Sequence, residues 1–303
     1  MFLSFVDWFY SPNFIEIGDF KIAKYAIMIM MGIVFAIIMG VRECKRVGIK
    51  LDDLYDGILY IVPLSIIGAR LYYVIFEWSS YKDNLLKIFY IWEGGLAIHG
   101  AFLTAIICAI IYCKIRKIDI YKVVDLIAPG FLIGQIFGRW GNFFNVEAYG
   151  PVVGKGALTA VEQNAWLKGH LVPNFVVKNM AISTGGEGYL DSIGETILGY
   201  YHPTFFYESC WNIIGLIIIF ILRRTRLTRS GELLSVYLIW YSIGRFFIES
   251  MRQDSLYIKM FGQEFRQAQV ISVGLIIVGI IFFVYVRFFK KTKFYHEILT
   301  EKK

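Results

Sequence analysis

Long runs of apolar residues recur along the chain and are separated by shorter polar segments. A transmembrane helix needs about 20 predominantly apolar residues to cross the hydrocarbon core of a bilayer. The runs that approach this length lie near residues 24–41, 57–76, 94–112, 124–141, 205–222, 233–250 and 269–289. The pattern predicts an all-α polytopic membrane protein with seven transmembrane helices.

The fourth run is the most polar, because it contains Asp125, Gln135 and Arg139. It also carries three glycines at four-residue spacing, which would let another helix approach it closely. These are Gly130, Gly134 and Gly138. We therefore interpret this run as a membrane span.

Composition supports the membrane assignment. Hydrophobic residues make up 57% of the chain and the mean hydropathy is +0.57, values well outside the range of ordinary soluble domains. The formal net charge of +7 favours contact with anionic lipid head groups and is no argument for a nucleic-acid partner.

The distribution of lysine and arginine predicts the orientation, since cytoplasmic loops carry the excess of positive charge. Eighteen of these residues fall in segments 42–50, 114–122, 223–229 and the tail from residue 287, whereas nine fall in the opposite set of segments. The N-terminus is therefore expected outside and the C-terminus in the cytoplasm, which agrees with an odd number of spans.

The chain is expected to form a single membrane-embedded domain over residues 1–303. Its longest outside segment, residues 142–204, is expected to fold as a small extracytoplasmic cap between the fourth and fifth helices. The first 18 residues contain no basic start or small-residue cleavage site, so they are interpreted as an aromatic interfacial segment. No internal repeat is apparent, which counts against transporters built from duplicated halves.

Four basic residues lie at membrane depth: Lys24, Arg70, Arg139 and Arg245. Lys24 could snorkel from a helix end. An arginine nearer the middle of a span costs roughly 2.5–3.5 kcal/mol on insertion scales, so it must face a protein interior, a wet cavity or an anion. Structural ion pairing with an intramembrane carboxylate is the alternative for each arginine.

The sixth run contains "YSIGRFFIES", which places Tyr241, Arg245 and Glu249 at four-residue intervals on one helical face. This face offers a hydroxyl, a fixed cation and a carboxylate. Arg245 and Glu249 could also simply neutralise each other.

The end of the fourth run, "GRWGNFFNVE", forms a second polar region. Arg139 and Asn142 share a helical face there, and Asn145 and Glu147 follow as the helix ends. Guanidinium groups suit phosphate oxygens and stay charged at any relevant pH. Two separate arginines therefore suggest a dianion or a phosphodiester ligand, and a transported anion fits equally well.

Two histidines occupy distinctive positions. His99 lies just inside the third run, where a neutral imidazole could act as a general base; a buried histidine satisfied by one hydrogen bond is the alternative. His202 precedes Pro203 where the fifth helix should begin, so it could anchor the cap. The cysteines and the His and carboxylate positions show no ligand-like spacing, so we expect no metal and no cofactor.

The stretch "GRWGNFFNVEAYG" closely resembles the signature of bacterial prolipoprotein diacylglyceryl transferases. The matching positions are Gly138, Arg139, Gly141, Asn142, Phe143, Asn145, Glu147 and Gly150. Other landmarks of that family follow in order along nearly the whole chain: Tyr25, "GARLYYV" from Gly68, "GGLAIHG" from Gly94, "HPTFFYE" from His202 and "GRFFIESMR" from Gly244.

The resemblance implies an enzyme of the bacterial cytoplasmic membrane. Such enzymes move the diacylglyceryl group of phosphatidylglycerol to the lipobox cysteine of a prolipoprotein, forming a thioether and releasing glycerol 1-phosphate. Phosphatidylglycerol and prolipoprotein signal peptides are therefore the expected partners. Because the substrate brings the nucleophilic thiol, the protein needs no catalytic cysteine of its own.

The resemblance also suggests residue roles. Arg139 would bind the phosphate and act in catalysis together with Arg245. The head group would be held by a further set of residues: Tyr25, Asn142, Asn145, Glu147, Gly150 and Tyr241. His99 is the candidate for taking the thiol proton, Glu249 would position Arg245 or act as the base, Arg70 would be structural or a secondary lipid contact, and His202 would have a supporting role.

Two other functions compete with this reading. A transporter or channel for anions or lipids would also use buried arginines and glycine-rich helices, but it would not require the whole signature. An intramembrane protease or a different lipid-head-group transferase would also place polar residues near the bilayer surface. A protease should show a Ser/His pair or two intramembrane aspartates, and the sequence contains neither arrangement. A relative that has lost activity could keep all the named residues.

Overall fold

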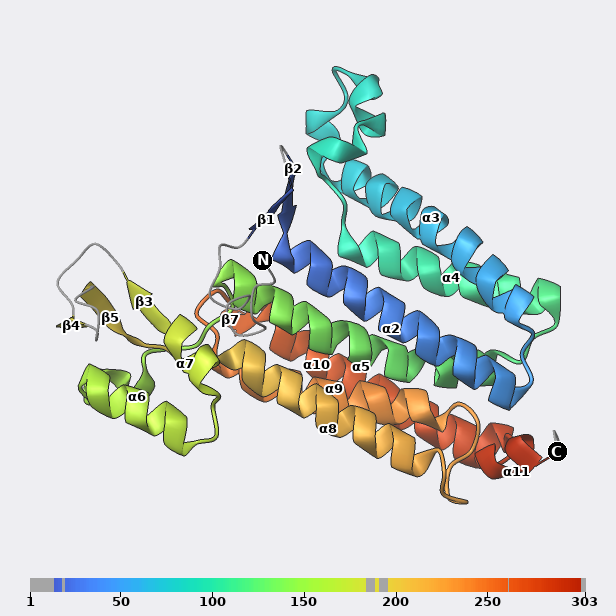
Figure 1. Ribbon diagram of the computed structural model, residues 1–303. Helices are drawn as coiled ribbons and strands as arrows, with labels where there is room; N and C mark the ends of the chain where they lie inside the picture. The colour runs from blue at the N-terminus through green and yellow to red at the C-terminus, as the bar shows by residue number, and fades with distance from the viewer. Residues whose placement is uncertain (1–13, 18–19, 184–188, 191–195, 261, 301–303) are drawn as a thin grey trace. The chain divides into compact units, whose positions relative to one another are not determined.

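The structure is a computed structural model that describes residues 14–17, 20–183, 189–190, 196–260 and 262–300. Within these residues the chain is mostly helical, with short strands at three places (Figure 1). The interfacial segment expected at residues 1–18 lies mostly outside the described part.

Among the described residues, six helices are long and apolar enough to cross a membrane. They are α2 (Lys24–Val47), α3 (Leu51–Phe76), α4 (Ile98–Arg116), α5 (Ile120–Asn145), α8 (Thr204–Leu222), and α10 (Gln267–Val284) with its π-helical continuation η5 (Tyr285–Lys290). The chain is therefore a multi-pass membrane protein. The run expected at 233–250 also forms a helix, α9 (Glu232–Met251), which is not one of these six.

The chain folds into two compact units. The first comprises Met1–Ile38 and Ile127–His296, and the second comprises Met39–Leu126 and Glu297–Lys303. Helices α2 and α5 each contribute residues to both units. The units are described separately below.

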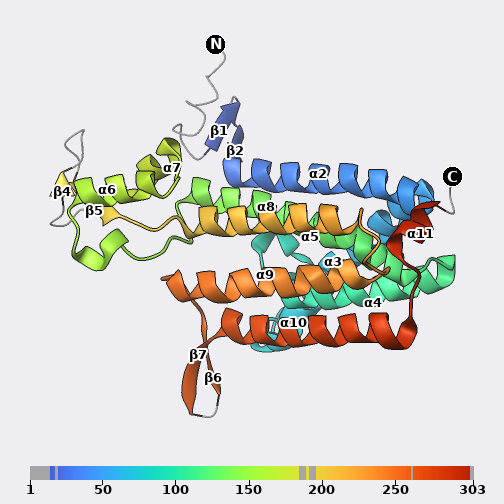
Figure 2. The same cartoon turned by 90° about the horizontal axis from the view of Figure 1, so that it is seen from below.

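In the first unit, α8, α9 and α10 run side by side (Figures 1 and 2). Helices α2 and α5 approach each other where their glycines lie: a Cβ added to Gly32 would be 3.5 Å from Gly134 Cα and 3.0 Å from Phe137 Cβ. The rings of Phe35 and Phe137 stack beside this point at 5.2 Å. The glycine that this approach requires is therefore Gly32 on α2. A Cβ added to Gly134 would meet nothing within 4 Å, and one added to Gly130 or Gly138 would make only ordinary contacts at 3.8 and 3.9 Å, so the expectation that the α5 glycines permit the close approach is wrong.

The segment between α5 and α8 folds on the ends of these helices. It contains η4 (Val153–Gly156), α6 (Ala160–Gly169), α7 (Asn174–Asn179) and a small antiparallel sheet of strands β3 (Ala181–Ser183), β5 (Thr196–Tyr200) and β4 (Tyr189–Leu190). Helix α6 begins with a capping box between Thr159 and Glu162. Apolar residues of the segment form one core with Phe143, Phe144 and Phe205 from the two helices, so the segment is packed against the helix ends.

Two hairpins complete the first unit. Strands β1 (Phe14–Ile17) and β2 (Phe20–Ala23) precede α2. Strands β6 (Tyr257–Met260) and β7 (Gln263–Arg266) project from the ends of α9 and α10 (Figure 2). The second hairpin is tied to α9 by Arg266, which donates to the backbone carbonyls of Glu249 and Arg252.

The second unit is built around α3 and α4, which pack closely: a Cβ added to Gly100 would lie 2.6 Å from the Gly68 carbonyl oxygen. Short 3₁₀ turns connect the two helices: η1 (Trp78–Ser80), η2 (Leu85–Phe89) and η3 (Ile91–Glu93). The run expected to start at residue 94 becomes helical only at Ile98, because Gly94 and Gly95 adopt positive φ angles of 89° and 71°.

The expectation that Lys24 could snorkel from a helix end is wrong. Its side chain does not snorkel to the surface, because the residue is 0% exposed at the start of α2. The ammonium nitrogen lies 5.1 Å from the centre of the Phe144 ring on α5, a cation–π geometry that favours a buried cation.

Candidate functional site

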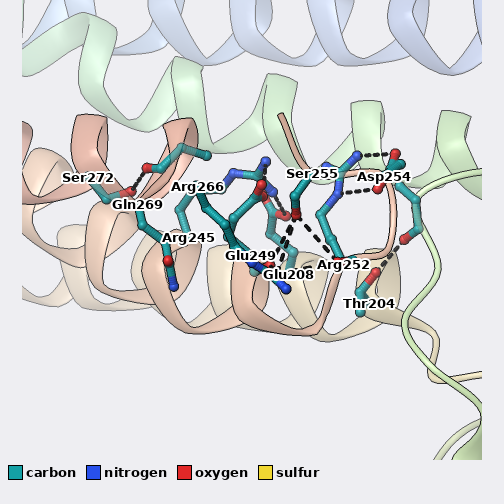
Figure 3. Close-up of polar contacts among 12 residues, drawn as sticks. Thr204, Glu208, Arg245, Glu249, Arg252, Asp254, Ser255, Arg266, Gln269 and Ser272 are labelled. Atoms are coloured by element: carbon teal, nitrogen blue, oxygen red, sulfur yellow. Dashed lines mark hydrogen bonds and ion pairs between the residues drawn. The ribbon is translucent and has the colours of Figure 1, made fainter. Parts of the chain in front are cut away.

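Two arginines, Arg139 on α5 and Arg245 on α9, contact the carboxylate of Glu208 on α8. Glu208 is 2% exposed; one of its carboxylate oxygens lies 2.9 Å from Arg139 Nη2, and the other lies 3.3 Å from Arg245 Nη1. Figure 3 shows the Glu208 and Glu249 carboxylates gathered beside Arg245. The two arginines predicted from separate motifs thus converge on a single anionic group.

Glu249 supplies a second carboxylate to Arg245. Its Oε2 lies 2.6 Å from Arg245 Nη2, one helical turn away on α9, which confirms the shared face predicted for this helix. Two guanidinium groups and two carboxylates therefore balance each other in charge. The arginine side chains still keep 18% and 14% of their surface exposed for Arg139 and Arg245 respectively, so the cluster is not sealed.

The end of α5 continues this polar network. Arg139 Nη1 donates to Asn142 Oδ1 at 3.1 Å, and Asn142 Nδ2 donates to Glu147 Oε1 at 2.8 Å. Asn145 Nδ2 donates to the same Glu147 oxygen at 3.3 Å. The polar side chains of the predicted signature are therefore linked to one another.

The backbone around Glu147 is strained. Val146 and Ala148 have φ angles of 52° and 58°, a left-handed conformation that is uncommon for alanine and costly for a β-branched valine. These residues turn the chain at the end of α5, so the Glu147 backbone N–H donates to the Asn142 carbonyl oxygen at 3.1 Å. The strain thus places Glu147 against the asparagines.

Two predicted tyrosines lie beside the network. Tyr25 on α2 packs against the signature backbone, since a Cβ added to Gly141 would lie 2.7 Å from Tyr25 Cδ2. Tyr241 on α9 interacts with Arg139 and lies in the electrostatic field of Glu208 and Arg245. Gly141 is required for this approach because any larger residue would push the Tyr25 ring away.

Gly150 and His202 join the segment after α5 to the start of α8. The Gly150 backbone N–H donates to the His202 carbonyl oxygen at 2.8 Å, and the His202 backbone N–H donates to the Pro151 carbonyl oxygen at 3.0 Å. The His202 ring contacts the Tyr207 hydroxyl at 3.2 Å through Nδ1. Burial, with a smaller contribution from the neighbouring His170, lowers the pKa of His202. These contacts fit an anchoring role for His202.

His99 and Arg70 belong to the second unit. His99 is exposed at the start of α4, with its ring 6.4 Å from the Tyr72 ring, so it is not a histidine buried for structural reasons. Arg70 is 5% exposed and donates to the backbone carbonyls of Lys87, Ile88, Tyr90, Gly94 and Gly95 at 2.5–3.4 Å. These contacts favour the structural interpretation of Arg70.

A second polar cluster follows α9, and no sequence motif pointed to a role for it. Arg252 forms a bidentate pair with Asp254, through Nε at 2.9 Å and Nη2 at 2.6 Å, and this pair lowers the pKa of the Asp254 carboxyl. Arg266 donates to the Ser255 hydroxyl at 3.3 Å and to the carbonyls at the end of α9. This cluster fixes the end of the helix that carries Arg245 and Glu249.

In the part of the chain that the structure describes, no group of three or more His, Cys, Asp or Glu side chains is arranged to hold a metal ion. Cys108, Cys113 and Cys210 are not joined in disulfides. The structure instead brings together guanidinium and amide groups, which can bind an oxyanion, and the carboxylates that neutralise the guanidinium groups.

Comparison with known proteins identifies the family. The prolipoprotein diacylglyceryl transferase family matches residues 12–285, which is most of the chain. The chain belongs to this family.

Three relatives are each named phosphatidylglycerol–prolipoprotein diacylglyceryl transferase. The relative from Halalkalibacterium halodurans is 43% identical over 274 residues, covering 90% of this chain and 86% of the relative. The Listeria innocua relative is 41% identical over 287 residues, which cover 95% of this chain and 94% of the relative. The Lysinibacillus sphaericus relative is 43% identical over 270 residues, which cover 89% of this chain and 90% of the relative.

Family membership confirms the resemblance carried by the signature, whereas the site geometry adds a residue that the motifs did not single out. Glu208 lies in the "HPTFFYE" landmark, but sequence reasoning gave it no role. One signal was available, because a carboxylate in an apolar helix is as unfavourable as an arginine and needs a cationic partner.

Proposed function

We propose that this chain transfers the diacylglyceryl group of phosphatidylglycerol to prolipoproteins, and that Arg139 and Arg245 form its phosphate site. Membership of the transferase family supports the reaction. The observation that supports the site is the convergence of both guanidinium groups on Glu208 at 2.9 and 3.3 Å. A phosphodiester presents two non-bridging oxygens that share one negative charge, as the two oxygens of a carboxylate do, so it can replace one carboxylate between two arginines.

Phosphate binding at this site is an exchange of anions. Glu208 and Glu249 neutralise Arg139 and Arg245 before lipid arrives, which reduces the cost of holding two cations at membrane depth. The phosphodiester then takes over part of this neutralisation. Because Arg245 keeps Glu249 one turn away, its guanidinium stays oriented while its contact with Glu208 changes.

The chemistry follows from the charge that develops on the leaving group. The lipobox thiol attacks the glycerol carbon that carries the phosphate ester, the C–O bond breaks, and glycerol 1-phosphate leaves as a thioether forms. Negative charge grows on the phosphate oxygen in the transition state. Arg139 and Arg245 interact more strongly with that charge than with the ground-state diester, which lowers the barrier.

The thiol must lose its proton during the attack. His99 is one candidate acceptor, because it is an exposed imidazole and an imidazole nitrogen can take a proton from a thiol. Glu249 is the alternative, although its 2.6 Å ion pair with Arg245 favours a positioning role. A guanidinium group directly beside the thiol would also favour the thiolate form.

The remaining residues of the network orient the head group. Asn142, Asn145 and Glu147 form one connected set of amide and carboxylate groups next to Arg139, and such groups can bind the hydroxyls of glycerol. Tyr25 and Tyr241 border this set. Gly150 acts through the backbone, by holding the following segment close to His202.

The proposed topology has seven spans, with α9 as the sixth in chain order. Its charged residues Arg245 and Glu249 pair with each other or with Glu208, which makes the helix compatible with the bilayer. The N-terminus then lies outside, the C-terminus lies in the cytoplasm of a bacterial cell, and residues 142–204 form the extracytoplasmic cap.

The orientation is tested by labelling cysteine variants of intact cells with a membrane-impermeant thiol reagent. The reagent should modify Lys168→Cys and should not modify Lys50→Cys; the reverse pattern would overturn this orientation.

The function is tested with purified protein in detergent and a lipobox peptide. The peptide should gain the mass of a diacylglyceryl group with phosphatidylglycerol and should not gain it with phosphatidylethanolamine. A peptide that carries serine in place of the lipobox cysteine is the matched control. Folded protein that leaves the cysteine peptide unmodified in the presence of phosphatidylglycerol would contradict the proposal.

A further inference from the structure

Helices α8 and α9 share a short sequence pattern that the function has not used. Residues 211–215 read "WNIIG" and residues 240–244 read "WYSIG", so each helix carries a tryptophan followed four residues later by a glycine. The first pattern begins three residues after Glu208. The second ends directly before Arg245.

The two tryptophans form a reciprocal contact between the helices. Their rings stack at 4.2 Å with an interplanar angle of 13°. Trp211 Nε1 donates to the Trp240 carbonyl oxygen at 2.8 Å, and Trp240 Nε1 donates to the Trp211 carbonyl oxygen at 2.9 Å. Both indole N–H groups are thus satisfied at a half-buried contact between two apolar helices, where an unpaired donor would be costly.

Each ring fits over the glycine of the other helix. A Cβ added to Gly215 would overlap Trp240 Cδ1 and lie 2.5 Å from its Nε1, and a Cβ added to Gly244 would overlap the Trp211 indole. The glycines are therefore required for the rings to lie flat between the helices. We call this arrangement of Trp211, Gly215, Trp240 and Gly244 the tryptophan lock.

The lock sets the axial register of α8 against α9, not only their separation. A slide of one residue along a helix is about 1.5 Å, which is enough to break both indole hydrogen bonds. The same slide would move Arg245, which follows Gly244, relative to Glu208, which precedes Trp211 by one turn. The 3.3 Å contact between Arg245 and Glu208 therefore depends on the register that the lock maintains.

We propose that Trp211 and Trp240 are positioning residues that hold Arg245 in register with Glu208 and Arg139, so that two guanidinium groups converge on one phosphate. This inference rests on the proposed function of Arg245 as a phosphate ligand. A purely structural lock would hold the helices together without affecting lipid recognition. The two roles therefore differ in their effect on the two substrates.

The test uses Trp211→Phe, Trp240→Phe, the double variant and Gly215→Ala, with Trp92→Phe and Gly274→Ala as matched controls. Trp92 is an exposed tryptophan of the second unit, and a Cβ added to Gly274 meets nothing within 4 Å. Phosphatidylglycerol affinity is measured by equilibrium binding without peptide, and both KM values are measured during turnover. Each protein is first shown to be folded by thermal unfolding and size-exclusion chromatography.

Each lock variant should raise the Kd and the KM for phosphatidylglycerol about tenfold, while the peptide KM stays within about twofold. The Kd and KM of the double variant should be no higher than those of either single variant, since the tryptophans act as a unit.

Gly215→Ala keeps the test valid if a tryptophan variant does not fold. Unchanged lipid affinity in the folded variants, or equal effects on both substrates, would overturn the proposal. If the wild type bound the lipid but made no thioether, the transfer function would fail, whereas the binding comparison would still decide the role of the lock.

Discussion

The Glu208 carboxylate lies 2.9 Å from the Arg139 guanidinium, although the two residues come from different helices and are far apart in the sequence. The other oxygen of the same carboxylate contacts Arg245. Glu208 thus occupies the position between the arginines where the lipid phosphate is proposed to bind. On this proposal, Glu208 both spaces the two cations and competes with the substrate anion.

Glu208→Gln should separate these two effects. Removing the competing charge should lower the KM for phosphatidylglycerol about threefold to tenfold. Loss of the ion pairs that orient the arginines should lower kcat by about tenfold or more. Steady-state kinetics with varied lipid checks both values, and Glu264→Gln, on the exposed β7 strand, is the control. A variant whose KM and kcat both match the wild type would show that Glu208 has neither role.

Arg70→Lys should destabilise the second unit by about 3–5 kcal/mol, because one ammonium cannot replace the guanidinium contacts to several backbone carbonyls and would leave some of them unpaired. Unfolding can be followed with a thiol-reactive dye, since Cys113 is a buried thiol of this unit. Arg42→Lys is the control at an exposed position. If Arg70→Lys instead kept full stability and lost only lipid binding, the alternative of a secondary lipid contact would be favoured.

Gly150→Ala should destabilise the protein by about 1–3 kcal/mol through overpacking. The added Cβ would lie 2.9 Å from His202 Cβ and 3.2 Å from the Met251 carbonyl oxygen, so the backbone must shift. The turnover rate of Gly150→Ala should fall together with its stability, because the segment after α5 would move relative to α8 and α9. Denaturant unfolding and the transfer assay measure the two effects. Gly169→Ala, whose Cβ meets nothing within 4 Å, should change neither; a Gly150→Ala protein as stable and active as this control would refute the packing argument.

The lowered pKa of His202 predicts a loss of stability on acidification. Burial, followed by the proximity of His170, keeps the folded imidazole neutral, while the unfolded residue takes up a proton near its ordinary pKa of about 6.5. The unfolded state therefore binds more protons as the pH falls below that value, and stability decreases toward the folded-state pKa. Comparing unfolding of the wild type and His202→Gln at pH 7.5 and pH 5.5 measures this effect. Equal pH dependence in the two proteins would exclude His202 as its source.

The transmembrane helices could be predicted because a long apolar run needs no tertiary information. The helix α9 could be predicted despite its charges, because the apolar run at residues 233–250 is long enough for a helix of this length. The local contacts of the site could also be predicted from the sequence, because Arg139, Asn142 and Glu147 interact at the end of a single helix.

The contacts between helices could not be predicted in the same way. Glu208 meets Arg139 and Arg245 only because α8 packs beside its neighbours, and apolar periodicity does not report which helices become neighbours. The tryptophan lock depends on the same packing. Lys24 was misjudged for a related reason, since a position at a helix end permits snorkelling only if no other part of the protein covers it.

Whether Arg139 holds the phosphate of the lipid during transfer can be decided by one paired measurement. Wild type and Arg139→Ala, each purified and shown to be folded, are given phosphatidylglycerol and a lipobox peptide, and glycerol phosphate release is followed together with peptide mass. We predict equal amounts of released glycerol phosphate and diacylglyceryl peptide for the wild type, and a loss of both by about 100-fold or more in Arg139→Ala. Transfer at the wild-type rate by folded Arg139→Ala would show that this arginine does not hold the phosphate.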